Sequence, residues 1–183
     1  MYAAPDLHLV HGGHKGTEAA FGEVAEKFGI SETTLSFEGH AMERAVNVEV
    51  LDDEALDKGR VSMDFVFQAI GRRFASGDGV RRVIHSMFHV VTRTDELFTV
   101  GWILENDSVR GGTGWGVELA KLFNRKVHVF DQDKHAWFTW DHDEWKQSEP
   151  TLPESGAFSA TGTRTLTDEG RGAVEDLFKR SLG

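Results

Sequence analysis

The sequence predicts an α/β fold in which one mostly parallel sheet lies between two layers of helices. Short apolar segments typical of buried strands alternate along the chain with segments of helical periodicity, the pattern of layered α/β proteins. Three glycine-rich turns, over residues 11–18, 110–118 and 161–164, each follow a strand segment and precede a helical one. No linker is long or biased enough to divide the chain, so we expect residues 1–183 to form a single domain.

The first part of the chain predicts two strands and one helix. Residues 7–10 are apolar and run into a Gly-Gly pair, which indicates a buried strand that ends in a turn. Residues 17–28 carry apolar side chains at helical spacing, and Gly29 is suited to end that helix. Residues 33–37 are rich in β-branched side chains and predict a second strand. Residues 39–51 show no clear period, and we expect a loop there with a short extended piece.

A long helix is expected next, with Asp52 or Asp53 as its N-cap and its end at about Ala75. Its inward side is predicted from the apolar residues that recur at helical spacing. These residues are Ala55, Leu56, Val61, Phe65, Val66, Ala69 and Ile70. The sequence Ser-Gly-Asp-Gly at residues 76–79 then breaks the helix.

The rest of the chain continues the alternation of helices and strands, and residues 148–155 form a proline-containing connection. The expected elements are a helix over 80–92, a strand over 97–104, a helix over 115–123, a buried strand over 126–130, a short edge strand over 136–140, a strand over 157–160 and a last helix over 167–180. Because the carboxyl ends of parallel strands meet at one edge of a sheet, all three glycine turns are expected on that edge, where such folds bind ligands.

The glycine turns predict a site for phosphate or carboxylate, because a strand that ends in glycines and feeds a helix exposes backbone N–H groups and a helix dipole. Tight turns and close helix packing need glycine without any ligand as well. The residues that we expect to bind a phosphate or another part of the ligand are Gly12, Gly13, Lys15, Gly16, Thr17, Gly111, Gly112, Thr113, Gly114, Thr161, Gly162 and Arg164. For Arg164, an ion pair with Asp168 is the alternative.

The turns resemble the motifs of a known superfamily. Residues 111–118 resemble the PGGxGTxxE signature of the Lonely-Guy phosphoribohydrolases, with Arg110 in place of its Pro and Trp115 in place of its Thr. Residues 11–18 resemble the GGxxGxD loop of the SLOG superfamily of Rossmann-like nucleotide-binding proteins. Residues 161–168 resemble the TGxRxLxD segment of that superfamily.

The third match stands in an unusual place, because in SLOG proteins that segment normally begins the domain and here it ends the chain. We therefore expect a circularly permuted, SLOG-type Rossmann-like fold whose termini lie near each other. The resemblance implies a nucleotide-like small-molecule ligand and a homodimer. It also implies roles for individual carboxylates: Glu118 matches the catalytic glutamate of the signature, and Glu18 lies near the usual Asp. Asp131 follows a buried strand at the same edge, and together with Glu18 it is a candidate for binding ribose hydroxyls.

Two functions of different classes fit these motifs. The first is a domain that binds a nucleotide or a related ribose-phosphate compound, with the phosphate at the glycine turns and the ribose held by Glu118. The second is a nucleotide N-glycoside hydrolase, in which Glu118 polarises the ribose or acts as general base on water. Relatives with that activity carry an arginine on the preceding helix, where this chain has Ser86 and Met87. The missing arginine favours binding without catalysis.

Composition excludes several other classes. The formal net charge is −10, which disfavours a third reading, a nucleic-acid binder of the DNA-processing type. No apolar stretch is long enough to span a membrane. The chain has no cysteine and no signal-peptide pattern, so we expect a cytoplasmic protein without disulfides. Neither the histidines at 8, 11 and 14 nor the pair His85 and His89 completes a metal site, and we expect neither a metal nor a cofactor.

Overall fold

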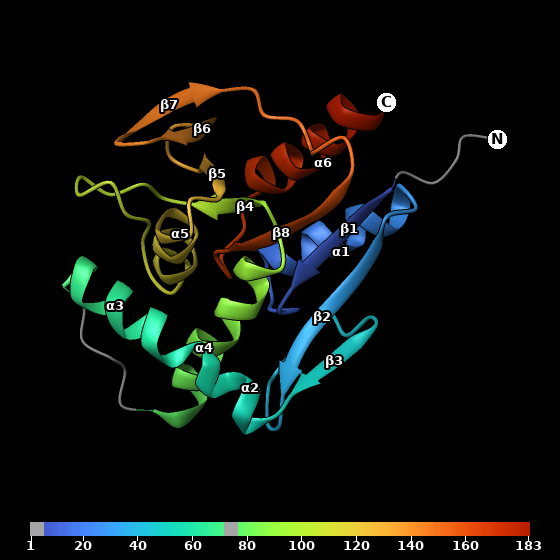
Figure 1. The fold of residues 1–183 in the computed structure, drawn as a ribbon. Coiled ribbons are helices and arrows are strands. Elements are labelled where there is room, and N and C mark those ends of the chain that lie inside the picture. Colours follow the sequence, from blue (N-terminus) through green and yellow to red (C-terminus); the bar gives the residue numbers. More distant parts are fainter. Residues whose placement is uncertain (1–5, 72–76) are drawn as a thin grey trace.

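The computed structural model describes residues 6–71 and 77–183. In chain order its elements are β1 (Leu7–His11), α1 (Thr17–Lys27), β2 (Ser31–Phe37), β3 (Val48–Leu51), α2 (Asp53–Lys58), α3 (Arg60–Ile70), α4 (Asp78–Thr92), β4 (Glu96–Gly101), α5 (Thr113–Leu122), β5 (Lys126–Asp131), β6 (Ala136–Asp141), β7 (Glu144–Ser148), β8 (Gly156–Gly162) and α6 (Asp168–Leu182). The strands form one sheet, with α1 and α6 on one face and α2 to α5 on the other (Figure 1). The predicted three-layer α/β fold is confirmed.

The strand order in the sheet is β3-β2-β1-β8-β4-β5-β6-β7. Neighbours from β3 to β5 are parallel, and the hairpin of β6 and β7 is antiparallel. If β8 is counted as the first strand, β1 as the second, β2 as the third, β4 as the fourth and β5 as the fifth, these strands lie in the order 3-2-1-4-5. This is the strand order of Rossmann folds. This is the order that a circular permutation predicts.

The end of α6 and the start of β1 lie at the same edge of the sheet, as expected for a permuted chain. Ser181 near the end of α6 accepts a hydrogen bond from the backbone of Leu152, just before β8. At the start of β8, Gly156 is paired with Leu7 of β1. The carboxyl ends of the parallel strands, and with them the three glycine turns, lie at the opposite edge.

Alternating residues of the strands point to opposite faces of the sheet and fill separate cores. In β4, Phe98 faces α1 and α6, where it packs with Phe21, Phe158 and Phe178. Its neighbour Leu97 points to the other face, toward the core under α3, α4 and α5. Both residues are almost fully buried, so each face of β4 is covered and the strand cannot shift register without exposing one core.

The expected helix from Asp52 to Ala75 is two helices within the described residues, and its positions 72–75 lie outside them. The break falls at Gly59, where a Cβ atom would lie 2.6 Å from the carbonyl oxygen of His85. The expected inward side is correct for Leu56 and Val66 and wrong for Val61, Phe65 and Ala69, which are exposed. Because the chain forms two helices, the buried side of the second does not continue that of the first, and Met63 is buried instead.

The strand predictions need two corrections. The strand expected over 97–104 ends at Gly101, and a loop over residues 102–112 follows it. The edge strand expected over 136–140 is present as β6, but β7 pairs with it and forms the edge. The five residues of β7 are mostly polar and exposed, so they carry no hydrophobic pattern from which a strand is predicted.

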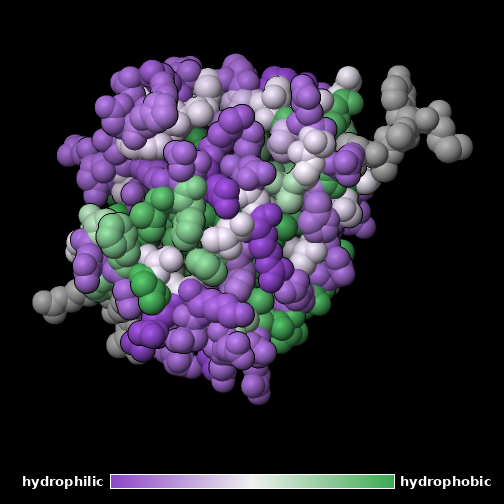
Figure 2. All heavy atoms as spheres, viewed as in Figure 1, coloured by the Kyte–Doolittle hydropathy of each residue, from purple (hydrophilic) through white to green (hydrophobic). Residues whose placement is uncertain are grey.

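Most of the surface in view is hydrophilic, and hydrophobic residues gather on it over α3 and α5 (Figure 2). The exposed apolar residues of these helices include Val61, Phe65 and Leu122. Apolar patches of this kind are typical of contact surfaces between proteins. The homodimer stays a prediction. No helix among the described residues has the length and apolar composition needed to cross a membrane.

The first and third glycine turns pack directly against each other. The backbone of Gly16 has φ +90°, and a Cβ atom there would lie 2.5 Å from the carbonyl oxygen of Thr163. The backbone N–H and the hydroxyl of Thr17 both donate to that same carbonyl oxygen, at 3.1 and 3.0 Å. This contact joins residues far apart in sequence and fixes the two loops relative to each other.

Replacing Gly16 by alanine is expected to lower the free energy of unfolding by about 2 to 4 kcal/mol, because it adds backbone strain and a steric clash. The control is Gly172→Ala in α6, where a Cβ atom meets nothing within 4 Å. That change should stabilise the protein by about 0.5 to 1 kcal/mol through helix propensity. Denaturant unfolding measures both, and equal effects of the two substitutions would contradict the packing of the turns.

Candidate functional site

A cleft lies at the carboxyl edge of the sheet, beside the ends of the neighbouring strands β8 and β4. The chain leaves β8 toward α6 on one face and leaves β4 toward α5 on the other. Neighbouring strands whose connections diverge in this way leave a crevice, the usual ligand site of open α/β sheets. The cleft here has a volume of about 550 Å³. Its lining residues are His14, Glu18, Val83, Met87, Trp102, Arg110, Gly111, Gly112, Thr113 and Thr161 to Thr165.

The structure brings together about half of the residues expected from the sequence. Those that line the cleft are Glu18, Gly111, Gly112, Thr113, Thr161, Gly162 and Arg164. Those that do not are Gly12, Gly13, Lys15, Gly16, Thr17, Gly114, Glu118 and Asp131. Gly12 lines a small adjoining cavity. All three glycine turns contribute to the cleft, but the second and third contribute more of its wall than the first.

The carboxylate of Glu18 fills the first glycine turn from inside. Its Oε2 accepts hydrogen bonds from the backbone N–H groups of Gly12 and His14, at 3.1 and 3.0 Å. The same oxygen lies 2.8 Å from Nδ1 of His14, and Oε1 accepts from the Thr161 hydroxyl at 3.0 Å. The third N–H of the turn, from Gly13, donates to the side chain of His11. An internal carboxylate and an internal imidazole therefore use the donors that a bound phosphate would need.

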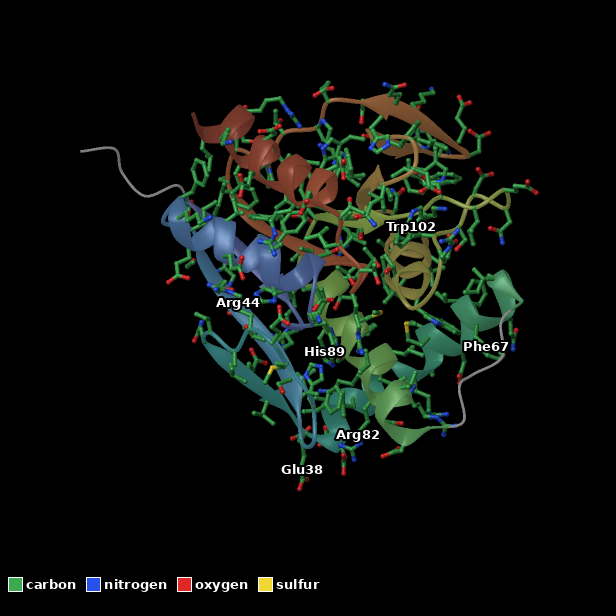
Figure 3. All side chains as sticks on the ribbon, turned by 180° about the vertical axis from the view of Figure 1, so that it is seen from behind. Glu38, Arg44, Phe67, Arg82, His89 and Trp102 are labelled. Carbon is green, nitrogen blue, oxygen red and sulfur yellow. The ribbon has the colours of Figure 1, made fainter. Side chains whose placement is uncertain are left out.

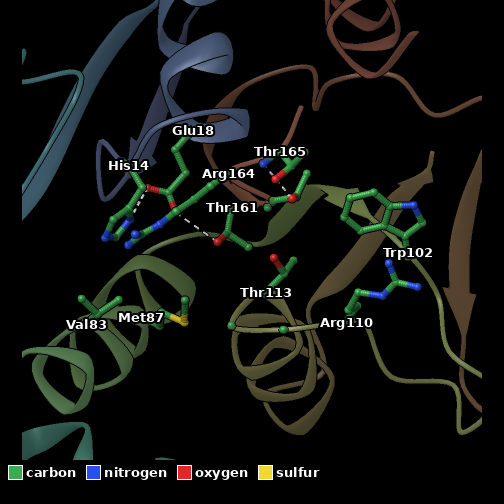
Figure 4. Close-up of a pocket in the computed structure, with 14 residues that line it drawn as sticks. His14, Glu18, Val83, Met87, Trp102, Arg110, Thr113, Thr161, Arg164 and Thr165 are labelled. Carbon is green, nitrogen blue, oxygen red and sulfur yellow. Dashed lines mark hydrogen bonds and ion pairs between the residues drawn. The ribbon is translucent and has the colours of Figure 1, made fainter. Parts of the chain in front are cut away.

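Glu18 is ionised in the folded protein. Burial by itself favours the neutral carboxyl, but the adjacent His14 and the hydrogen bonds to the charged form outweigh it and lower the pKa of Glu18 to about 2. The pKa of His14 is raised, because Glu18 favours the imidazolium more than burial opposes it. His14 and Glu18 thus form an ion pair at the wall of the cleft, as Figure 4 shows.

A second histidine contacts His14 from the loop after β2. Nε2 of His40 lies 2.8 Å from Nε2 of His14, and the ring of His40 stacks on Phe37. Burial and the charge on His14 lower the pKa of His40 to about 4, so His40 is the neutral acceptor of this pair. His40 could not be predicted as a site residue from the sequence, because it lies in a loop without a motif.

Arg44 holds that loop against the first glycine turn. The backbone N–H groups of Glu43 and Arg44 donate to the carbonyl oxygen of Gly13. The guanidinium of Arg44 is largely buried and pairs with Glu32 of β2 and Glu26 of α1. Figure 3 shows Arg44 beside these two elements. Glu32 in turn lies 2.7 Å from Nε2 of the fully buried His11. This network of charges keeps the loop and the turn in one arrangement.

The second glycine turn presents donors to the cleft. It runs into the first turn of α5, and Gly111 takes φ +71° to enter the helix. Among the described residues, the backbone N–H groups of Gly112 and Thr113 have no hydrogen-bond partner. The dipole of α5 places partial positive charge at the same point. This turn can therefore accept an anion without losing a bond within the protein.

The third turn places a cation at the rim. Arg164 is exposed, and its guanidinium has no ion pair or hydrogen bond within residues 6–71 and 77–183, so the alternative pairing with Asp168 does not form. Figure 4 shows Arg164 beside His14 and Glu18, on the side of the cleft away from Trp102. A free guanidinium of this kind is suited to bidentate contact with a phosphate or carboxylate.

Trp102 and Arg110 form the opposite wall. The guanidinium of Arg110 lies over the indole ring of Trp102, 4.9 Å from its centroid. The indole N–H donates to Asp133, which fixes the ring. Sequence reasoning missed Trp102 as a site residue because the strand was expected to continue through it to residue 104. Flat cationic and aromatic groups together are typical of surfaces that stack on a base or a similar ring.

Glu118 and Asp131 lie outside the cleft. Gly116 of α5 faces β8, and Glu118, two residues later, points to the other side of the helix. Its carboxylate accepts a hydrogen bond from Lys121, 3.0 Å away. Asp131 is 2% exposed and accepts three backbone N–H bonds, from Ile103, Asp133 and Lys134. Those bonds shape the loop that carries Trp102 and leave Asp131 no access to a ligand in the cleft.

Histidines and carboxylates of the described residues form no cluster of three or more that is arranged to hold a metal ion. His8 contacts the hydroxyls of Ser31 and Thr33, and His89 contacts the carbonyl oxygen of Ala55. These histidines therefore have partners within the protein.

Comparison with known proteins supports the fold and does not assign a function. No protein-family model matches the sequence, and no curated protein matches it. A crystal structure from Syntrophus aciditrophicus SB, of a protein described as a "putative molybdenum carrier protein", superposes with a TM-score of 0.57 at 15% sequence identity. The match covers 98% of this chain and 97% of that one. Identity this low shows a shared fold and does not transfer a function.

Glu18→Gln tests whether the internal carboxylate holds the site together. The neutral amide of glutamine cannot replace a charged carboxylate that accepts four hydrogen bonds. We therefore expect the free energy of unfolding at pH 7 to fall by about 2 to 3 kcal/mol. Glu23→Gln is the control, because Glu23 lies on the same helix in an exposed ion pair with Arg171. Its effect should stay within about 1 kcal/mol.

Glu18→Gln should also change how strongly the free energy of unfolding depends on pH in the acid range. A carboxylate whose pKa is lowered from 4.5 to about 2 stabilises the fold above about pH 5, and this stability is lost as the pH falls toward 2. We expect Glu18 to account for up to about 3 kcal/mol of that loss. Denaturant unfolding between pH 2 and pH 7 should show a shallower decline of the free energy of unfolding in Glu18→Gln than in the wild-type protein. An unchanged slope would contradict the assignment.

Proposed function

We propose that the cleft binds a nucleotide or a nucleotide-like small molecule that carries phosphate. The observation that carries this proposal is the set of unused donors at the second and third turns, facing one cavity with an aromatic wall. The N–H groups of Gly112 and Thr113 stand at the start of α5, and Arg164 stands at the rim. A volume of about 550 Å³ lies in the range of small-molecule sites and exceeds what a single oxyanion needs.

The groups divide between the parts of such a ligand. The phosphate would accept hydrogen bonds from Gly112 and Thr113, in the field of the α5 dipole. The ring would stack at the wall made by Trp102 and Arg110, 4.9 Å apart. The first turn would not contact the phosphate, because Glu18 occupies its donors. The ligand would therefore lie across β8 and β4, between the second and third turns.

The same observations support membership of the SLOG superfamily in a circularly permuted form. The three motifs, the strand order counted from β8 and the shared fold with the Syntrophus structure agree with one another. Binding without turnover is the form of the proposal that the geometry favours. Glu118 would be the catalytic carboxylate of a phosphoribohydrolase, and its side chain pairs with Lys121 outside the cleft.

The Syntrophus protein suggests a second candidate ligand, a molybdenum compound. In neutral water molybdenum occurs as the molybdate anion, and the N–H donors of Gly112 and Thr113 suit this oxyanion as well as a phosphate. Molybdate alone has no ring to stack on Trp102, so the two candidates differ in their need for that residue.

A thermal-shift screen with nucleoside monophosphates and molybdate tests the proposal, since a ligand that binds only the folded state raises the melting temperature. We expect nucleotides to stabilise the protein and Trp102→Ala to weaken their affinity about tenfold through lost stacking. Glu118→Gln should leave the affinity unchanged. Stabilisation by molybdate that is insensitive to Trp102→Ala would favour the second candidate.

Incubation with the same nucleotides, followed by assay for the free base, separates binding from hydrolysis. We expect no release of base. Release that Glu118→Gln abolishes would establish the hydrolase instead. No stabilisation by any nucleotide would contradict the proposed function itself.

A further inference from the structure

Two cationic side chains stand together at one end of the cleft, away from the aromatic wall. Arg164 lies close enough to His14 for the two charges to repel, and the repulsion opposes the protonation of His14. Glu18 balances the charge of His14, with its Oε2 2.8 Å from Nδ1. Within the described residues the guanidinium of Arg164 has no such counter-ion. This end of the cleft therefore carries one uncompensated positive charge.

The order of groups along the cleft is informative. In Figure 4, Thr113 at the start of α5 lies between Arg164 on one side and Trp102 with Arg110 on the other. A ligand that stacks its ring on Trp102 and places a phosphate at Thr113 therefore points its far end toward Arg164. A nucleoside monophosphate ends at Thr113 and leaves Arg164 unpaired.

We propose that Arg164 and His14 form a second phosphate subsite, so that the cleft prefers a nucleoside diphosphate to a nucleoside monophosphate. This inference rests on the proposed function. Arg164 supplies the hydrogen bonds to the second phosphate, because its planar guanidinium matches a pair of phosphate oxygens. His14 acts through its charge, since Glu18 and His40 engage its two ring nitrogens.

The subsite also makes the preference depend on pH. The titratable and charged groups that face His14 are Glu18 from α1, His40 from the loop after β2 and Arg164 from the loop after β8. The residues that α4 contributes to this part of the wall, Val83 and Met87, do not titrate. Raising the pH deprotonates His14, whose pKa is raised above its usual 6.5, and removes one of the two positive charges. The preference for two phosphates should then decline as the pH rises through the pKa of His14.

Isothermal titration calorimetry with ADP and AMP tests the inference on the full chain. At pH 7 we expect ADP to bind about tenfold more tightly than AMP, the effect of one charge-assisted contact. Arg164→Gln should bring the two affinities within about twofold of each other by loss of ADP affinity alone. The matched control is Arg171→Gln, an exposed arginine of the next helix that pairs with Glu23, and it should keep the wild-type ratio.

The outcomes separate this inference from the proposed function. Equal affinities of wild-type protein for ADP and AMP, or equal effects of Arg164→Gln and Arg171→Gln, would overturn the second subsite and leave nucleotide binding intact. Binding of neither nucleotide would contradict both. If the ratio of the affinities of the wild-type protein for ADP and AMP stays constant from pH 7 to pH 9, His14 does not belong to the subsite. This measurement needs no variant.

Discussion

The site depends on one buried carboxylate. Glu18 accepts hydrogen bonds from the first glycine turn, from the imidazole of His14 and from Thr161 of β8, so it joins α1, the loop after β1 and the strand beside it. Leaving such donors without an acceptor in a buried place costs free energy. Because Glu18 is charged and fully engaged, the two central loops of the sheet edge are fixed before any ligand binds.

The hydrogen bonds of Glu18 also determine which donors at the carboxyl edge of the sheet remain available to a ligand. The donors of the first turn are used within the protein, whereas those at the start of α5 and on Arg164 are not. Three glycine turns of similar sequence therefore have different uses: the first is a structural element closed by Glu18, and the second and third form the walls of the cleft. Arg44 and its partners Glu26 and Glu32 complete the fixed side by holding the loop of His40 against the first turn.

The fold and the location of the cleft could be predicted from the sequence, because strand and helix periods are local and parallel strands bring their ends to one edge. The contacts of single side chains could not. The pairing of Glu18 with Thr161 joins residues 143 positions apart. The break at Gly59 depends on the close approach of His85. The direction of Glu118 depends on how α5 packs on β8, since a matching motif spacing does not fix which side of the helix faces the cavity.

The direct test of this account is a nuclear magnetic resonance titration of the ¹⁵N-labelled protein with ADP, which reports on each backbone N–H group separately. The account predicts that the largest shifts occur at Gly112 and Thr113, with further shifts around Arg164 and small ones at Gly12 and Gly13. Shifts concentrated at Gly12 and Gly13, with Gly112 and Thr113 unaffected, would contradict it, because the phosphate would then occupy the position assigned to Glu18.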